Sequence, residues 1–269
     1  MYRQIINIFG MPRSGTSWLS QIFDSSPEVR FRRSPLFSYE FKNYVNEQSG
    51  KDAWEHVFKG AYLSESEFMN QTVRRNAKEY PVFTEKDQYP EFLVMKDTRF
   101  HNLIKRLLEL FENVKAVMIV RHPCGSIHSW LKSPSELPST ADPMREWRTG
   151  SCRKNGYGEF WGFEDWKLVT HLHLRLAKAY PERCIIQKYE DLVRNPVRET
   201  KRLFAFCGLR YSPQTNLFIK ECHTRHVENE YAVYKNPSVA YAWRSGLSPD
   251  IKEAILNEIA GTDLEEFIR

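Results

Sequence analysis

The sequence lacks the features that would place it among membrane-spanning, disulfide-bonded or zinc-binding proteins. None of its apolar runs approaches the ~18 residues that a transmembrane helix needs. Its five cysteines are odd in number and show no short spacing, which argues against a disulfide framework or a zinc site. The chain enters an apolar segment at once, so we expect no signal peptide, although a chain trimmed of an N-terminal anchor would look the same. We therefore expect a cytoplasmic protein with reduced thiols and no membrane partner.

Neither basic nor acidic side chains are present in large excess. The formal net charge is +5, from 39 basic and 34 acidic side chains. This mildly basic balance suits an anionic ligand, but it lacks the long basic stripe that is typical of nucleic-acid binding. The only dense basic cluster, Arg30, Arg32 and Arg33, is consistent with a solvated edge or loop. We expect no nucleic-acid partner, and the pattern leaves a monomer and a homodimer equally open.

What the chain does contain is an alternation of short apolar runs with longer helical patterns. The length of 269 residues suits one large domain, and we take 1–269 as a single domain. Apolar runs predict strands at 3–9, 92–96, 114–120 and 184–187. Helical periodicity predicts helices at 16–24, 102–111, 126–131, 166–180, 197–207 and 251–260. The expected class is α/β, with a central parallel sheet flanked by helices.

One segment, 133–165, departs from this alternation. It is rich in Pro, Gly, Ser and Trp and has weak periodicity, so we expect an insertion or lid near a cleft. Aromatic side chains such as Trp147 and Trp161 alternate there with basic ones such as Arg148 and Arg153. A mixture of this kind can stack on a sugar, an aromatic ring or a cation. It can equally be a lid that packs on the core.

The segment Gly10–Leu19 has the character of a phosphate-binding turn between a strand and a helix. Two glycines allow a tight backbone that points several N–H groups inward, and the helix N-terminus adds partial positive charge. Ser14, Thr16 and Ser17 supply hydroxyls, and Arg13 supplies a fixed cation. Strand, glycines, hydroxyls and arginine together predict an anion cradle.

The same loop differs from that of magnesium-dependent kinases. The spacing Gly-x4-Gly matches the P-loop, but Thr16 stands where that motif has lysine. The strand 114–120 ends in Arg121-His122-Pro123, without the aspartate that would help to hold magnesium. A P-loop kinase or NTPase therefore becomes the alternative hypothesis, and a non-catalytic polyanion-binding protein is the third. No metal is expected.

The stretch from Pro12 to Trp18, Pro-Arg-Ser-Gly-Thr-Ser-Trp, resembles the loop of the sulfotransferases that use 3′-phosphoadenosine 5′-phosphosulfate (PAPS). The resemblance implies the P-loop nucleotide-kinase-like sulfotransferase fold. It also implies that Arg13, Ser14, Gly15, Thr16, Ser17 and Trp18 bind the 5′-phosphosulfate, with Arg13 on the leaving bridging oxygen. Arginine in place of lysine resembles the branch that acts on carbohydrates and other non-phenolic acceptors.

Three further matches follow in the same order as in that family. Arg121 at a strand end, with Ser129 eight residues later, resembles the 3′-phosphate site, and an arginine fork suits a phosphate. Tyr189 in Tyr-Glu-Asp-Leu resembles the tyrosine near the adenine, although a packed structural tyrosine fits as well. Arg244, after Trp243, is a loose match to a basic loop that closes on the 3′-phosphate.

The resemblance implies transfer of a sulfuryl group from PAPS to a hydroxyl or amine of a small-molecule or saccharide acceptor, with release of 3′,5′-adenosine bisphosphate (PAP). The acceptor must lose a proton, and here the sequence departs from its relatives. Thr98 stands where cytosolic members have histidine, and Arg33-Ser34 stands near the glutamate of other branches. Our candidates for the base are Asp97, then His101, then Glu40. Lys96 at the same strand end can assist charge stabilisation.

Overall fold

The structure is a computed structural model that describes residues 2–269, apart from the side chain of residue 223. Its centre is a parallel sheet with the strand order β2-β3-β1-β4-β5. The strands are β1 (Gln4–Phe9), β2 (Val29–Arg33), β3 (Phe92–Asp97), β4 (Val114–Val120) and β5 (Cys184–Lys188). The expected α/β class and parallel sheet are confirmed, and all strand ends meet at one edge.

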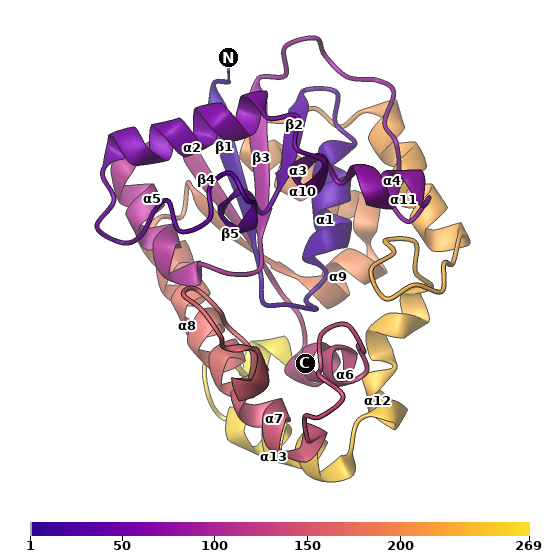
Figure 1. Cartoon of the computed structure of the whole chain (residues 1–269). Helices are drawn as coiled ribbons and strands as arrows, with labels where there is room; N and C mark the ends of the chain where they lie inside the picture. Colours follow the sequence, from indigo (N-terminus) through magenta and orange to yellow (C-terminus); the bar gives the residue numbers. More distant parts are fainter. Residues whose placement is uncertain (1) are drawn as a thin grey trace.

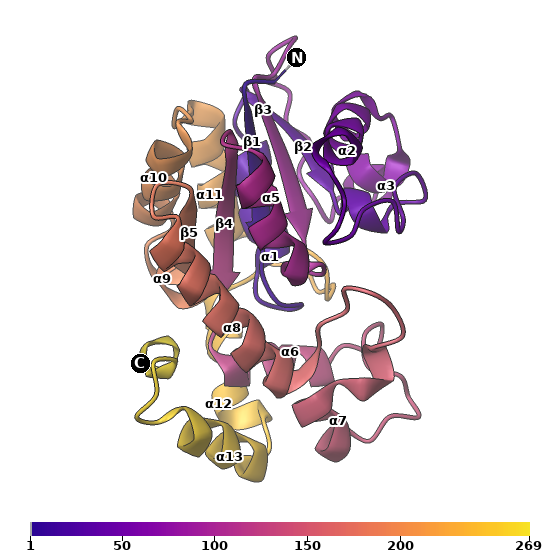
Figure 2. The ribbon, with the colours of Figure 1, turned by 90° about the vertical axis from the view of Figure 1, so that its left-hand side faces the viewer.

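Helices cover both faces of this sheet (Figures 1 and 2). The helices that belong to the sheet layers are α1 (Thr16–Asp24), α2 (Lys51–Leu63), α3 (Glu67–Asn70), α4 (Thr72–Asn76), α5 (Ile104–Leu110), α8 (Gly162–Ala179), α9 (Tyr189–Arg194), α10 (Pro196–Cys207) and α11 (Pro213–Thr224). One apolar cluster joins the sheet to α1, α10 and α11, and another joins it to α2 and α5.

The remaining helices gather below the carboxyl ends of the strands (Figures 1 and 2). They are α6 (Pro123–Leu131), α7 (Pro143–Thr149), α12 (Trp243–Gly246) and α13 (Pro249–Ile259). Their side chains form a third apolar cluster that includes the buried rings of Trp147, Trp161 and Trp243. The segment 133–165 thus contains a helix, α7, and packs on this cluster. Its role beside an acceptor stays a prediction.

Strict alternation assigns the side chains of the strands to the two faces. In β3, Phe92 and Val94 belong to the cluster on the α1 face, whereas Leu93 and Met95 belong to the opposite cluster. By the same alternation Lys96 lies on the α1 face and Asp97 on the other. In β2, Val29 and Phe31 pack on the α1 face. This alternation decides which of the polar side chains at the strand ends can share one site.

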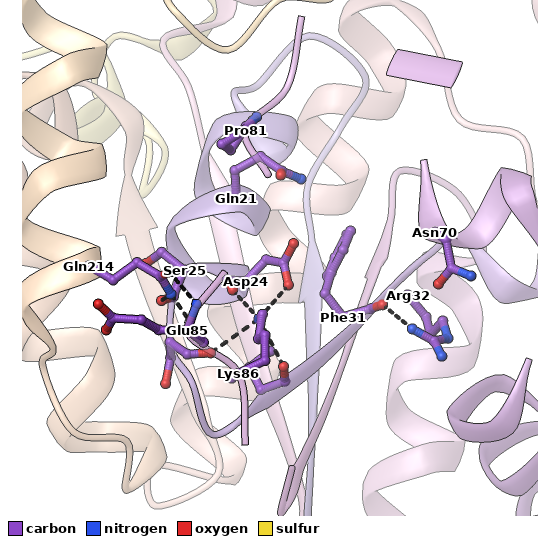
Figure 3. A network of polar contacts seen from close by, with 12 residues as sticks. Gln21, Asp24, Ser25, Phe31, Arg32, Asn70, Pro81, Glu85, Lys86 and Gln214 are labelled. Atoms are coloured by element: carbon purple, nitrogen blue, oxygen red, sulfur yellow. Dashed lines mark hydrogen bonds and ion pairs between the residues drawn. The ribbon is translucent and has the colours of Figure 1, made fainter. Parts of the chain in front are cut away.

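The C-terminus of α1 is tied to the sheet by a buried ion cluster (Figure 3). Asp24 is 3% exposed. Its carboxylate accepts from Lys86 Nζ at 2.8 Å and pairs with Arg75 at 2.5 Å. Lys86 also donates to the carbonyl oxygen of Val29 at 3.0 Å, at the start of β2. Burial tends to raise the pKa of Asp24, but the charges of Lys86 and Arg75 outweigh it and lower that pKa.

The described part of the chain contains no helix that is both long and apolar enough to cross a membrane. All five cysteines are free, and only Cys152 among them is not fully buried.

The sequence-predicted elements agree with the structure within a few residues, but one strand and several helices were missed. The basic cluster Arg30, Arg32 and Arg33, which we interpreted as a solvated edge or loop, lies in β2, the edge strand of the sheet, but these side chains are partly or largely buried rather than solvated. The helices α2 and α11 were also not predicted. β2 was missed because three arginines in five residues hide the two apolar side chains that alternate with them.

Candidate functional site

A cavity of about 370 Å³ lies at the carboxyl ends of the strands, the place where ligands bind in open parallel sheets. Residues that follow every strand line it: the turn after β1, Ser34 after β2, Thr98 after β3, Arg121 after β4 and Tyr189 after β5. A volume of this size suits a small-molecule ligand.

The turn after β1 forms one wall of the cavity. Arg13 has φ 66° and Gly15 has φ 91°, so two left-handed residues wind the chain into the first turn of α1. The hydroxyl of Ser14 donates to the carbonyl oxygen of Met11 at 2.5 Å and closes the turn from behind. Successive N–H groups at a helix N-terminus in this conformation create a concave site for an anion.

Gly15 is required at its position for two reasons. Its φ of 91° disfavours any side chain, and a Cβ there would lie 2.4 Å from Cδ2 of Tyr189. The ring of Tyr189 also meets Trp18 edge-on, with ring centroids 6.3 Å apart. The guanidinium of Arg121 lies over the Tyr189 ring at 4.7 Å. Tyr189 is therefore packed between the turn and Arg121, and it forms part of the cavity wall.

Arg121 and Ser129 lie beside the turn, as their spacing predicts. Arg121 is 6% exposed. Its Nη1 donates to the carbonyl oxygen of Arg13 at 3.0 Å, and its Nη2 donates to that of Ala240 at 3.4 Å. Arg13 donates from Nε to the Ser129 hydroxyl at 3.2 Å and from Nη2 to the carbonyl oxygen of Glu230 at 3.1 Å. Two cations and a hydroxyl thus converge at this end of the cavity.

Most of the sequence-predicted ligand-binding residues line the cavity. These are Arg13, Gly15, Thr16, Ser17, Trp18, Arg121, Ser129 and Tyr189. Ser14 lies behind the turn, and the exposed Arg244 stacks on Tyr241 at 5.0 Å rather than lining the cavity. The neighbouring Trp243 stacks on His122 at 4.2 Å.

The three candidate bases do not line this cavity. Asp97 is 5% exposed and faces a second, small cavity beside Phe9 and Trp54, on the opposite face of the sheet. Burial raises the pKa of Asp97 to about 7. His101 is fully buried, packs against Phe160 at 5.2 Å, and has its pKa lowered by burial to about 3. Glu40 is exposed and accepts from Ser64.

The structure therefore brings none of these three side chains to the cavity wall, and their assignment as the base stays a prediction.

Lys96 does reach the cavity, although it is only 7% exposed. Burial, followed by the positive charge of Arg33, lowers the pKa of Lys96 to about 7. Sequence reasoning missed several cavity residues altogether: Phe37, Phe68, Arg74, Tyr80, Arg99, Tyr231 and Lys235. They come from irregular segments or very short helices, where no periodicity marks a side chain as facing a site.

Among the described residues, no group of three or more His, Cys, Asp or Glu side chains is placed to hold a metal ion. The cavity is instead lined by hydroxyls, backbone N–H groups and basic side chains. Such a set is suited to bind a highly charged anion directly.

Comparison with known proteins agrees with this chemistry. The profile of a family described as the Sulfotransferase family matches residues 5–213. A Caenorhabditis briggsae protein named as a protein-tyrosine sulfotransferase is 24% identical over 223 residues, which are 79% of this chain and 68% of that protein. Mouse carbohydrate sulfotransferase 4 is 30% identical over 94 residues, which are 34% of this chain and 24% of that enzyme.

Solved structures share the fold at low sequence identity. A sulfotransferase from Alicyclobacillus acidocaldarius is 14% identical and superposes with a TM-score of 0.59, covering 100% of this chain and 96% of that one. A mouse sulfotransferase complexed with PAP is also 14% identical, with a TM-score of 0.58 and coverage of 100% and 88%. The predicted fold is therefore confirmed.

Proposed function

The chain belongs to the sulfotransferase family, and from that premise we propose that it transfers the sulfuryl group of PAPS to a hydroxyl or amine of a small-molecule or saccharide acceptor and releases PAP. The observation that carries the proposal is the convergence of Arg13, Arg121 and Ser129 on one end of the cavity, with the turn after β1 between them. PAPS carries two phosphate-based anionic groups, and this end of the cavity offers a separate cationic partner to each.

Each group has a distinct role in this proposal. The turn and the N-terminus of α1 bind the 5′-phosphosulfate, and Arg13 neutralises the bridging oxygen. Arg121 and Ser129 hold the 3′-phosphate, and Tyr189 packs against the adenine. In the transfer, the acceptor oxygen forms a bond to sulfur while the bond from sulfur to the bridging oxygen breaks. PAP leaves with that electron pair, and the acceptor proton passes to a base.

Charge stabilisation by fixed groups accounts for most of the catalysis in transfers of this type. Lys96 lies on β3, adjacent to the strand that precedes the turn. In its protonated form it supplies positive charge to the equatorial sulfuryl oxygens. A metal is not part of this scheme, because Arg13, Lys96 and the backbone N–H groups supply the positive charge.

One titration separates the proposal from its rivals. We expect PAP to bind the protein with micromolar or tighter affinity in the absence of magnesium, as measured by calorimetry. A P-loop kinase would instead require magnesium and prefer Mg-ATP. A non-specific polyanion-binding protein would show weak, salt-sensitive binding with equal affinity for PAP and ATP.

The acceptor is best identified by transfer itself. Purified protein with labelled PAPS is incubated with pooled hydroxylated metabolites, amines and glycans, and labelled products are separated. Transfer to one pool, and none in protein with Arg13→Ala, would support the proposal. Tight PAP binding with hydrolysis of PAPS but no transfer to any pool would argue against it.

A further inference from the structure

The cavity wall carries further positive charge besides Arg13 and Arg121. Its other basic side chains are Arg33, Arg74, Lys96, Arg99, Arg153 and Lys235. The acidic side chains on the whole cavity wall are Glu136 and Glu230. Both are already engaged: Glu136 accepts from the Tyr231 hydroxyl at 2.9 Å, and Glu230 accepts from Ser133.

Most of these cations already have a partner. Arg74 pairs with Glu79 at 2.8 Å, Arg99 pairs with Glu159 at 2.9 Å and Arg153 pairs with Glu136 at 3.6 Å. Lys235 donates to the carbonyl oxygen of Val227 at 3.0 Å. Arg33 and Lys96 form neither an ion pair nor a side-chain hydrogen bond with any described residue. They are direct neighbours, since Arg33 and Lys96 are register partners in the parallel pair of β2 and β3. A largely desolvated guanidinium group that forms no ion pair is costly unless an anion joins it, and the charge of Arg33 also contributes to the lowered pKa of Lys96.

Aromatic rings hold the guanidinium groups of Arg33 and Arg99 in place, and this stacking does not use their N–H donors. Arg33 lies over the ring of Phe68 at 4.6 Å, and Arg99 lies over the ring of Phe37 at 3.9 Å. The two rings pack against each other with centroids 6.0 Å apart. All four side chains line the cavity. Stacking fixes the plane of a guanidinium group and leaves its N–H fork free for a carboxylate, phosphate or sulfate.

The position of Arg33 distinguishes it from the residues proposed for PAPS. The turn follows the central strand β1 and Arg121 follows β4, whereas Arg33 ends the edge strand β2, on the other side of β1 from β4. Neighbouring strands lie about 4.8 Å apart, so β2 is roughly 10 Å from β1, with β3 between them. Lys96 lies on β3, the strand beside β1 and its turn, and Arg33 lies one strand farther from the turn while still lining the same cavity.

We propose that Arg33 is the core of an anion subsite for the acceptor, so that the acceptor carries a carboxylate, phosphate or sulfate group in addition to the hydroxyl or amine that receives the sulfuryl group. This inference rests on the proposed function, because it presumes that PAPS fills the turn and the Arg121 end. Lys96 lies between the two anions and is shared by them. A neutral acceptor would leave the charge of Arg33 uncompensated.

The experiment measures binding to the PAP-saturated protein by calorimetry. The probes are two matched pairs, 4-hydroxyphenylacetate with its amide and glucuronate with glucose. The wild type is compared with Arg33→Gln, and Arg30→Gln is the matched control. Arg30 lies on the same strand but donates to the carbonyl oxygen of Tyr62 at 3.3 Å and stacks on that ring at 4.4 Å, away from the cavity.

We expect at least one anionic probe to bind at least tenfold more tightly than its neutral partner. The preference should fall to less than threefold in Arg33→Gln and persist in Arg30→Gln. The inference is overturned if neither anion is preferred, or if Arg33→Gln keeps the preference.

PAP affinity, measured first for each protein, separates the two proposals. Failure of the wild type to bind PAP would contradict the proposed function. Normal PAP binding without an anion preference would rule out only the proposed acceptor subsite.

Discussion

The Nε of Arg13 donates to the hydroxyl of Ser129 across 3.2 Å, from the turn after β1 to the helix α6. The residues proposed to hold the two phosphate-based groups of PAPS therefore contact each other directly. A bound nucleotide that engages both residues must exchange this contact for contacts of its own. Because the two residues touch, removing one also removes a partner of the other, so each half-site is tested with a nucleotide that has or lacks the 3′-phosphate.

Ser129→Ala should weaken PAP binding about tenfold to a hundredfold, because a hydrogen bond to a charged phosphate contributes about 1.5–3 kcal/mol. Affinity for adenosine 5′-phosphosulfate, which lacks the 3′-phosphate, should change less than threefold. Calorimetric titration with both nucleotides checks this prediction. Equal losses for the two nucleotides would show that Ser129 does not recognise the 3′-phosphate.

Gly15→Ala should reduce PAP affinity more than tenfold, because the new Cβ would lie 2.4 Å from the Tyr189 ring and displace the turn. Gly208→Ala is the matched control: its φ of 79° is similarly strained, but nothing lies within 4 Å of the added Cβ. We expect Gly208→Ala to lower stability by about 1 kcal/mol and to retain PAP binding. Normal PAP binding by Gly15→Ala would contradict this account of the turn.

Asp24→Asn should lower the free energy of unfolding by about 3–5 kcal/mol at pH 7, because Lys86 and Arg75 lose a buried counter-charge. Asp87→Asn, at an exposed position, should have little effect. Since the folded-state pKa of Asp24 is lowered, its contribution is present above the unfolded pKa of about 3.9. The contribution should disappear as the pH falls through the folded pKa, as measured by urea unfolding from pH 7 to pH 3.

The donor end of the site was predictable from sequence, and the acceptor end was not. Arg13 and Gly15 lie in a contiguous turn, and Arg121 and Ser129 span a strand end and one helix, so short-range spacing determined their positions. Arg33 and Lys96 are adjacent only because β2 and β3 pair in register. That pairing joins residues 63 positions apart in the sequence, and no local pattern reports it.

Side-chain alternation along β3 explains why Asp97, our first candidate for the base, does not line the cavity. Its place at a strand end was predicted well, but a side chain one residue further along a strand points to the opposite face. Lys96 therefore lines the cavity, and Asp97 lies behind the sheet.

Asp97→Asn tests this geometry. Burial raises the folded-state pKa of Asp97 to about 7, above its unfolded value. The free energy of unfolding of the wild type is therefore highest below about pH 4, where Asp97 is neutral in both states, and the difference is fully lost once the pH has risen through 7. The variant should therefore unfold at higher urea than the wild type at pH 8, by on the order of 1–2 kcal/mol, with little gain at pH 4. The turnover number for sulfuryl transfer tests the assignment of Asp97 as the base, and a change of less than threefold would remove Asp97 from the mechanism. A tenfold or greater loss of turnover with PAP binding intact would identify Asp97 as the base after all.

Lys96 should couple nucleotide binding to proton uptake. With a folded pKa of about 7, its amine is mostly neutral at pH 8 in the free protein. An anion bound in the adjacent turn favours the charged form and raises that pKa, so PAP should take up a proton as it binds. At pH 8 the phosphates of PAP, with second pKa values near 6, are already ionised and release little.

Calorimetry in two buffers of different ionisation enthalpy measures this uptake. We expect it to approach one proton at pH 8, to diminish below pH 7, where Lys96 is already charged, and to vanish in Lys96→Met. Lys96→Arg should retain PAP affinity within threefold and show no uptake, because arginine stays protonated throughout. Proton uptake that persists in Lys96→Met would assign the proton to another group. It would contradict the proposed role of Lys96 in stabilising the charge of the bound nucleotide.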